Sequence, residues 1–180
     1  MPANLPNVLT VARILLVPLM VFALLQKTTT WDVIAAFVFW LASVTDFVDG
    51  WLARRSELVS DFGKLADPIA DKLLVLAALA TLVALDRVAL WVAIVVVGRE
   101  LAVTLSRVVA AQHGDVIAAA WLGKVKTVVQ LLVIFLLILI APVPLWLDLL
   151  VYAMVAITLY SGADYFVGLR RTMRQTPTAG

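Results

Sequence analysis

The 180-residue sequence contains no cysteine, a single histidine and few charged residues. The absence of cysteine excludes a disulfide framework, thiolate catalysis and a cysteine-ligated zinc site. The N-terminus lacks the basic segment and the small-residue cleavage site of a secretory signal peptide, and Arg13 interrupts its apolar run, so we expect no removable leader. A basic domain with interleaved aromatic residues is also missing, and we therefore expect no nucleic-acid partner.

The residues that are present are strongly apolar: 64% are hydrophobic and only 14% are charged. Soluble domains contain about 45–50% apolar and about 25% charged residues, so this composition indicates an integral membrane protein. A bilayer core of about 30 Å requires roughly 20 apolar residues for each helical crossing. We therefore expect an all-α integral membrane protein with six transmembrane helices and a short N-terminal interfacial segment.

The breaks between apolar runs are short, which favours one domain over residues 1–170, followed by a flexible cytoplasmic tail over residues 171–180. Basic residues of membrane proteins favour the cytoplasmic side. If both termini are cytoplasmic, twelve of the fourteen basic residues lie on or towards that side, and only Lys27 and Arg87 fall outside. We therefore expect a multi-pass protein with both termini and its carboxylate cluster facing the cytoplasm.

Four aspartates stand close together in this charge-poor chain, near the end of one predicted helix and the start of the next. Because successive helical residues turn by about 100°, each pair of aspartates shares a helix face with small residues. These two stripes are Asp46, Asp49, Gly50 and Ala53 on the first helix, and Gly63, Asp67 and Asp71 on the second. If the two faces pack together, four carboxylates converge and the small residues leave room for a ligand.

Carboxylates gathered near a membrane repel one another and are costly to desolvate, so they need cations. Oxygen-only ligands favour hard ions such as Mg²⁺, Mn²⁺ or Ca²⁺, and paired hard cations are a recurrent device for clamping a phosphate. The pattern thus indicates phosphoryl transfer. Two alternatives explain less of the pattern. Interfacial salt bridges would account for any single acid but not for two stripes of acids with small residues. A divalent-cation transporter would use intramembrane carboxylates, but it gives no reason for Gly50, Ala53, Arg54 and Gly63.

The spacing Asp46-x2-Asp49-Gly50-x2-Ala53-Arg54-x8-Gly63-x3-Asp67-x3-Asp71 resembles the signature of the CDP-alcohol phosphatidyltransferase family at every specified position. The segments Asn4–Arg13, Arg99-Glu100 and Trp121–Thr127 are similar to its bacterial phosphatidylglycerophosphate synthase branch. The resemblance implies the CDP-alcohol phosphotransferase fold, usually as a homodimer, in the bacterial cytoplasmic membrane. It also implies a reaction in which an acceptor hydroxyl attacks the β-phosphorus of CDP-diacylglycerol and CMP leaves.

Carried over residue by residue, the resemblance implies two divalent cations, Mg²⁺ or Mn²⁺, held by the four aspartates. Asp71 is expected to be both a metal ligand and the general base of the reaction. The other metal ligands would be Asp46, Asp49 and Asp67. The cytidine diphosphate would be bordered by Asp46, Asp49, Gly50, Ala53, Arg54 and Gly63.

In that branch the acceptor is glycerol 3-phosphate, whose phosphate needs cationic residues separate from the metals. Arg99 is expected near the middle of a crossing, where an ionisable residue indicates function, and Arg107 lies about 80° around the same helix. Lys124 and Lys126 lie about 200° apart if both are helical, so the sequence leaves open which one faces the cavity. As alternatives, the acceptor could be inositol phosphate, serine or phosphatidylglycerol.

Two further interpretations stay open at this point. The segment before the first apolar run could contact a headgroup or phosphate, although helix capping and a flanking charge explain it equally well. Its polar residues are Asn7, Thr10 and Arg13. Glu100 could order Arg99 or Arg107.

Overall fold

The computed structural model describes residues 5–56, 61–112 and 121–175. Within these ranges every regular element is an α-helix, which confirms the all-α prediction. The helices are α1 (Leu5–Leu25), α2 (Thr29–Ser56), α3 (Asp61–Ala84), α4 (Leu90–Gln112), α5 (Trp121–Leu139) and α6 (Leu145–Gln175).

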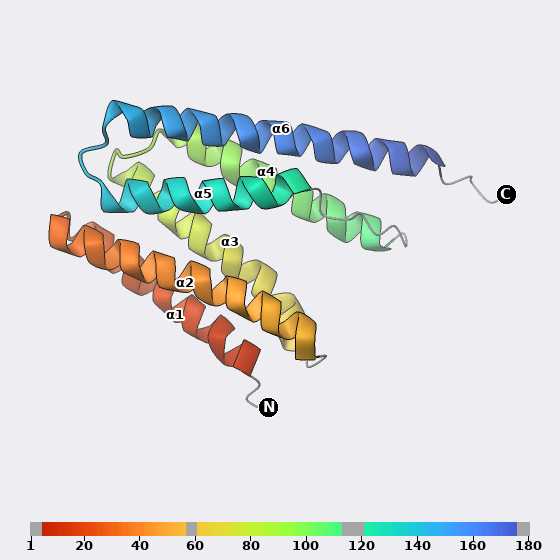
Figure 1. The fold of residues 1–180 in the computed structure, drawn as a ribbon, viewed down its shortest axis with the longest axis horizontal. Coiled ribbons are helices and arrows are strands. Elements are labelled where there is room, and N and C mark those ends of the chain that lie inside the picture. Colours follow the sequence, from red (N-terminus) through yellow and green to blue (C-terminus); the bar gives the residue numbers. More distant parts are fainter. Residues whose placement is uncertain (1–4, 57–60, 113–120, 176–180) are drawn as a thin grey trace.

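Consecutive helices run in alternating directions (Figure 1). The end of the bundle where α2 ends and α3 begins is called the carboxylate end here; α1 also begins there and α6 ends there. The short connections at residues 26–28, 85–89 and 140–144 lie at the opposite, short-loop end. Lys27 and Arg87 fall in two of these connections, so they lie away from the carboxylate end as the charge distribution predicts.

The helices pack around a core of small and branched apolar residues. α1 packs on α2 and α3, α5 packs on α2 and α6, and α4 packs on α6. Alanines where α1 and α2 bury their faces allow the two backbones to approach closely. Fully buried core residues include Met20, Ala23, Leu24, Ala35, Phe39, Ala42, Leu79, Leu82, Ile134, Leu137, Ile138 and Met154.

The outside of the bundle is apolar as well. Half or more of the surface of several large side chains is exposed, among them Leu15, Phe37, Ile94, Leu132 and Leu149. Soluble proteins rarely expose apolar surface on this scale, whereas a bilayer solvates it. In the described part of the chain, α5 and the segment Leu145–Arg170 of α6 are long and apolar enough to cross a membrane, with shorter apolar segments at Val11–Leu25, Thr29–Thr45 and Lys72–Ala84. These features are those of a membrane protein.

Three helix boundaries differ from the sequence-based expectation. α1 starts at Leu5 and continues without a break, so the expected interfacial segment is not a separate element among the described residues; Pro6 suits a first helical turn. α5 starts at Trp121, so Lys124 is helical. α6 continues to Gln175, into the range expected to be a tail, because arginines near a helix C-terminus are favourable.

Candidate active site

The helical backbone brings the predicted carboxylate positions to one end of the bundle. Asp46 and Asp49 lie in the last turns of α2, and Asp67 and Asp71 lie in the first turns of α3. α2 and α3 contact each other, so the two pairs stand on neighbouring helix ends. The side chains of these aspartates lie outside the described part of the structure, and their roles stay predictions. The same holds for Asn7, Thr10, Gly50, Ala53, Arg54 and Gly63.

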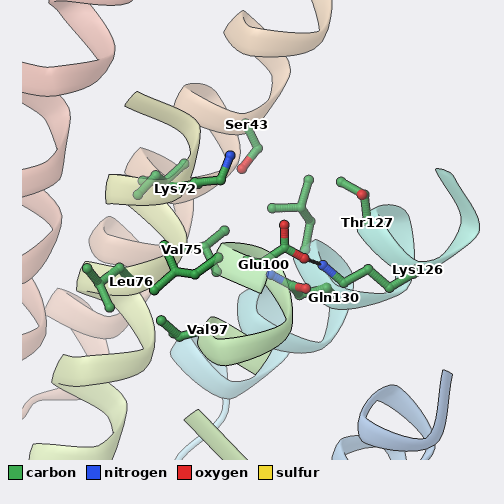
Figure 2. Close-up of a pocket in the computed structure, with 12 residues that line it drawn as sticks. Ser43, Lys72, Val75, Leu76, Val97, Glu100, Lys126, Thr127 and Gln130 are labelled. Carbon is green, nitrogen blue, oxygen red and sulfur yellow. Dashed lines mark hydrogen bonds and ion pairs between the residues drawn. The ribbon is translucent and has the colours of Figure 1, made fainter. Parts of the chain in front are cut away.

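A cavity of about 240 Å³ adjoins these positions between α2, α3, α4 and α5 (Figure 2). Ser43 lines it one helical turn before Asp46, and Lys72 lines it directly after Asp71. The cavity therefore lies directly beside the carboxylate positions of α2 and α3. Its full lining consists of Ser43, Lys72, Leu74, Val75, Leu76, Val97, Glu100, Leu101, Lys126, Thr127, Gln130 and Leu131.

One wall of the cavity carries a buried cluster of charges. The Lys126 side chain is only 3% exposed, and its ammonium donates a hydrogen bond to Glu100 Oε1. Arg99 donates from Nη1 to the same oxygen at 3.2 Å and from Nη2 to Ser161 Oγ on α6 at 2.7 Å. Two basic side chains thus share one carboxylate, so this three-residue cluster by itself carries more cationic than anionic groups, which suits an anionic ligand.

The other predicted acceptor residues lie elsewhere. Lys124 is exposed, so of the two lysines Lys126 is the one that faces the cavity. Arg107 is also exposed, and its guanidinium carbon lies 5.5 Å from the centre of the Tyr165 ring, a cation–π contact between α4 and α6. Arg13 is fully buried in α1. The structure therefore brings Lys126 and Arg99 together on Glu100. Of the four predicted acceptor residues only Lys126 lines the cavity; Arg99 lies behind Glu100, bonded to Ser161 of α6, and Lys124 and Arg107 are exposed.

Several polar residues at this site were not assigned to it from the sequence. Gln130 is buried in the cavity wall one turn after Lys126. Residues four positions apart share a helix face, so this spacing could have indicated from the sequence that Gln130 lies beside Lys126. Ser161 and Gly162 form a small-residue pair in an apolar helix, and a Cβ at Gly162 would lie 3.2 Å from Arg99 Cγ. This pair therefore makes room for Arg99 and supplies the hydroxyl that binds it.

The aspartate positions on α2 and α3 have the donor chemistry of a divalent-metal site. All four residues supply carboxylate oxygens, which suit Mg²⁺ and Mn²⁺. Among residues with described side chains, no group of three or more histidine, aspartate or glutamate residues is arranged to hold a metal. By the chemistry of their donor atoms Asp46, Asp49, Asp67 and Asp71 would suit such ions, and this role stays a prediction because their side chains lie outside the described residues.

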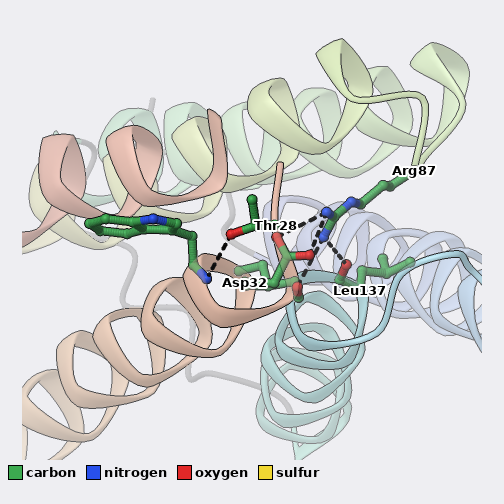
Figure 3. A network of polar contacts seen from close by, with 6 residues as sticks. Thr28, Asp32, Arg87 and Leu137 are labelled. Atoms are coloured by element: carbon green, nitrogen blue, oxygen red, sulfur yellow. Dashed lines mark hydrogen bonds and ion pairs between the residues drawn. The ribbon is translucent and has the colours of Figure 1, made fainter. Parts of the chain in front are cut away.

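A second buried ion pair lies at the short-loop end (Figure 3). Arg87 donates from Nη2 to both carboxylate oxygens of Asp32, at 2.9 and 2.7 Å. Its Nη1 donates to the carbonyl oxygens of Ile138 and Leu137, at 3.0 and 3.4 Å. A cation near the last carbonyl oxygens of a helix is favourable. Through these hydrogen bonds Arg87 links the α3–α4 connection to α2 and to the end of α5.

Comparison with known proteins identifies close relatives. Residues 3–160 match the family described as CDP-alcohol phosphatidyltransferase. The chain is 40% identical to the CDP-diacylglycerol–glycerol-3-phosphate 3-phosphatidyltransferase of Bacillus subtilis (strain 168), over 91% of this chain and 93% of the relative. It is 39% identical to a probable phosphatidylglycerophosphate synthase of Mycobacterium tuberculosis, over 91% and 80%. A Haemophilus influenzae protein with the same name as the Bacillus relative is 36% identical, over 73% and 74%.

Proposed function

The chain belongs to the CDP-alcohol phosphatidyltransferase family, and we propose that it transfers the phosphatidyl group of CDP-diacylglycerol to sn-glycerol 3-phosphate. The products are phosphatidylglycerophosphate and CMP, and the protein is a transferase of phospholipid biosynthesis. The relatives named for this reaction, which align over most of both chains, support the choice of acceptor.

The structural observation that carries this acceptor is the buried Lys126–Glu100–Arg99 cluster beside the carboxylate end. A phosphate monoester is a dianion, and it binds where cationic donors exceed the local carboxylates. Serine, a zwitterion without a phosphate, would gain little from this cluster. Inositol phosphate carries a phosphate as well, and the names of the relatives support glycerol 3-phosphate over it. In this proposal Arg99 and Lys126 bind the acceptor's phosphate, Arg107 and Lys124 add positive charge outside the cavity, and Asn7, Thr10 and Arg13 contact headgroup or phosphate.

The proposed chemistry is an in-line displacement at the β-phosphorus of CDP-diacylglycerol. The acceptor hydroxyl oxygen forms the new P–O bond, its proton passes to the Asp71 carboxylate, and the P–O bond to CMP breaks with its electrons leaving on CMP. Asp46, Asp49, Asp67 and Asp71 would hold two divalent cations, Mg²⁺ or Mn²⁺, which when bound neutralise phosphate charge and polarise the phosphoryl oxygens. The cytidine diphosphate is bordered by Asp46, Asp49, Gly50, Ala53, Arg54 and Gly63.

Positioning supplies much of the remaining rate enhancement. Asp71 is a weak base for an alcohol, so it takes the proton late, when the hydroxyl is already attacking. Small residues at positions 50, 53 and 63 allow the nucleotide to approach the helix backbone. Holding acceptor and nucleotide in attacking geometry converts a bimolecular step into an effectively unimolecular one.

The proposed setting is the bacterial cytoplasmic membrane, with all six helices crossing it and residues 1–170 forming one catalytic domain that works as a homodimer. The carboxylate end faces the cytoplasm together with both termini, because basic residues favour that side and Lys27 and Arg87 are the exceptions at the short-loop end. This orientation gives the site access to water-soluble glycerol 3-phosphate and to CDP-diacylglycerol in the cytoplasmic leaflet. The cytoplasmic tail would cover residues 171–180, of which the first five continue α6.

An acceptor comparison tests the proposal. Purified protein in detergent would receive CDP-diacylglycerol, Mg²⁺ and one acceptor at a time: glycerol 3-phosphate, inositol phosphate, serine or phosphatidylglycerol. We expect lipid product and CMP with glycerol 3-phosphate, and only background CMP release with the other three or with no acceptor. Higher kcat/KM for one of the others would overturn the assigned acceptor while leaving the family chemistry in place.

A further inference from the structure

Glu100 is the carboxylate shared by Lys126, which is buried in the cavity wall, and by Arg99, which lies next to it outside the cavity lining. Its Oε1 accepts hydrogen bonds from Lys126 on α5 and from its neighbour Arg99 on α4. The side chains of Lys126 and Arg99 are 3% and 13% exposed, whereas that of Glu100 is 27% exposed and lines the cavity. In Figure 2 the Glu100 carboxylate lies between Lys126 and the side of the cavity that carries Lys72.

The cluster leaves donors and an acceptor unused. A lysine ammonium has three N–H donors and an arginine guanidinium has five. Within the described part of the chain, Arg99 Nε and Gln130 Oε1 are buried without a hydrogen-bond partner. Gln130 lines the cavity, whereas Arg99 Nε lies on the α6 side, near Gly162. Buried polar atoms normally have partners, so the Gln130 oxygen indicates where a hydroxyl of a polar ligand can donate a hydrogen bond.

A buried cation without a carboxylate would not keep this arrangement. Removing one partner of a buried ion pair leaves an uncompensated charge, and a lysine on its flexible four-carbon stem relieves it by turning towards water. Arg99 has Ser161 as a second anchor, whereas Glu100 is the only hydrogen-bond partner of the Lys126 ammonium among the described residues. Glu100 therefore fixes the ammonium at the cavity wall and spaces it from the guanidinium.

We propose that Glu100 is a positioning residue of the acceptor site, which holds Lys126 and Arg99 in the arrangement that receives the phosphate monoester of the acceptor. This inference rests on the proposed function, because it needs an acceptor that carries a phosphate. It differs from a role in which Glu100 merely fills the phosphate position until the acceptor displaces it. In that second case, removal of its charge would strengthen acceptor binding.

The test is Glu100→Gln, which keeps the shape and one acceptor oxygen but removes the charge. We expect the KM for glycerol 3-phosphate to rise about tenfold or more, as for the loss of residues that orient a ligand-binding group. The KM for CDP-diacylglycerol should stay within about twofold, and kcat at saturating glycerol 3-phosphate should change less than that acceptor's KM. Glu100→Asp, which retains the charge on a shorter stem, should recover part of the loss.

The matched control is Asp32→Asn, which neutralises the carboxylate of the other buried ion pair, at the short-loop end. It should lower thermal stability and leave the ratio of the two KM values unchanged. An unchanged or lower KM for glycerol 3-phosphate in Glu100→Gln, or an equal rise in both KM values, would overturn the inference. If Glu100→Gln does not fold, the same ratio measured on Glu100→Asp decides. A wild-type protein that does not use glycerol 3-phosphate would instead defeat the proposed function, before any variant is made.

Discussion

Replacing Arg87 by methionine should destabilise the helix bundle strongly while leaving its chemistry intact. The change removes both hydrogen bonds to Asp32, whose side chain is 5% exposed, and uncaps the carbonyl oxygens of Leu137 and Ile138. Breaking a buried ion pair by removing one partner costs about 3–5 kcal/mol. With a shift of about 2–4 °C for each kcal/mol in a chain of this size, the melting temperature should fall by about 6–20 °C.

Thermal unfolding of the purified protein in detergent, followed by circular dichroism, measures this shift. Asp86→Asn is the matched control, because Asp86 is exposed in the same connection and its φ of 56° is one that asparagine tolerates. The double variant Asp32→Asn, Arg87→Met should melt above Arg87→Met alone, since it removes the uncompensated carboxylate. An Arg87→Met melting temperature within about 2 °C of wild type would show that the Arg87–Asp32 ion pair does not stabilise the bundle to this extent.

Three further predictions concern the site itself. Asp71→Asn should lower kcat by about 10²- to 10⁴-fold, as for loss of a general base, at an unchanged melting temperature; wild-type turnover would remove Asp71 from the mechanism. Lys126→Met should raise the KM for glycerol 3-phosphate at least about thirtyfold, as for truncation of a buried charge pair. Lys124→Met, at an exposed position, should change this KM about threefold or less. Equal effects of the two substitutions would contradict the assignment of Lys126 to the cavity. Gly162→Ala should raise the same KM more than that of CDP-diacylglycerol, because its Cβ would lie 3.2 Å from Arg99 Cγ; equal kinetics for variant and wild type would show that Arg99 tolerates the contact.

Local patterns in the sequence were sufficient for the elements that depend on neighbouring residues. Apolar runs separated by proline, glycine and charged turns predicted six helices, and the structure has six within its described ranges. The spacing from Asp46 to Asp71 predicted the family, which the match over residues 3–160 confirms. These features were predictable because helix periodicity and turn residues act within a few positions of the chain.

Features that join distant parts of the chain could not be predicted in the same way. Asp32 and Arg87 are 55 residues apart, and neither position carries a local signal for the other. The choice between Lys124 and Lys126 depended on the start of α5, and helix boundaries are the least reliable part of a sequence-based prediction. The position of Glu100 between Lys126 and Arg99 depends on how α4 and α5 each pack on α3 and α6, which is a property of the assembled bundle.

Phosphatidyl transfer to glycerol 3-phosphate can be measured by following labelled glycerol 3-phosphate into lipid. Purified protein in liposomes that contain CDP-diacylglycerol would receive Mg²⁺ and the labelled acceptor, and organic-phase label and released CMP would be counted together. We expect label to enter lipid only when CDP-diacylglycerol is present, with one CMP released for each label transferred. Release of CMP without labelled lipid, or labelled lipid without CDP-diacylglycerol, would contradict this expectation.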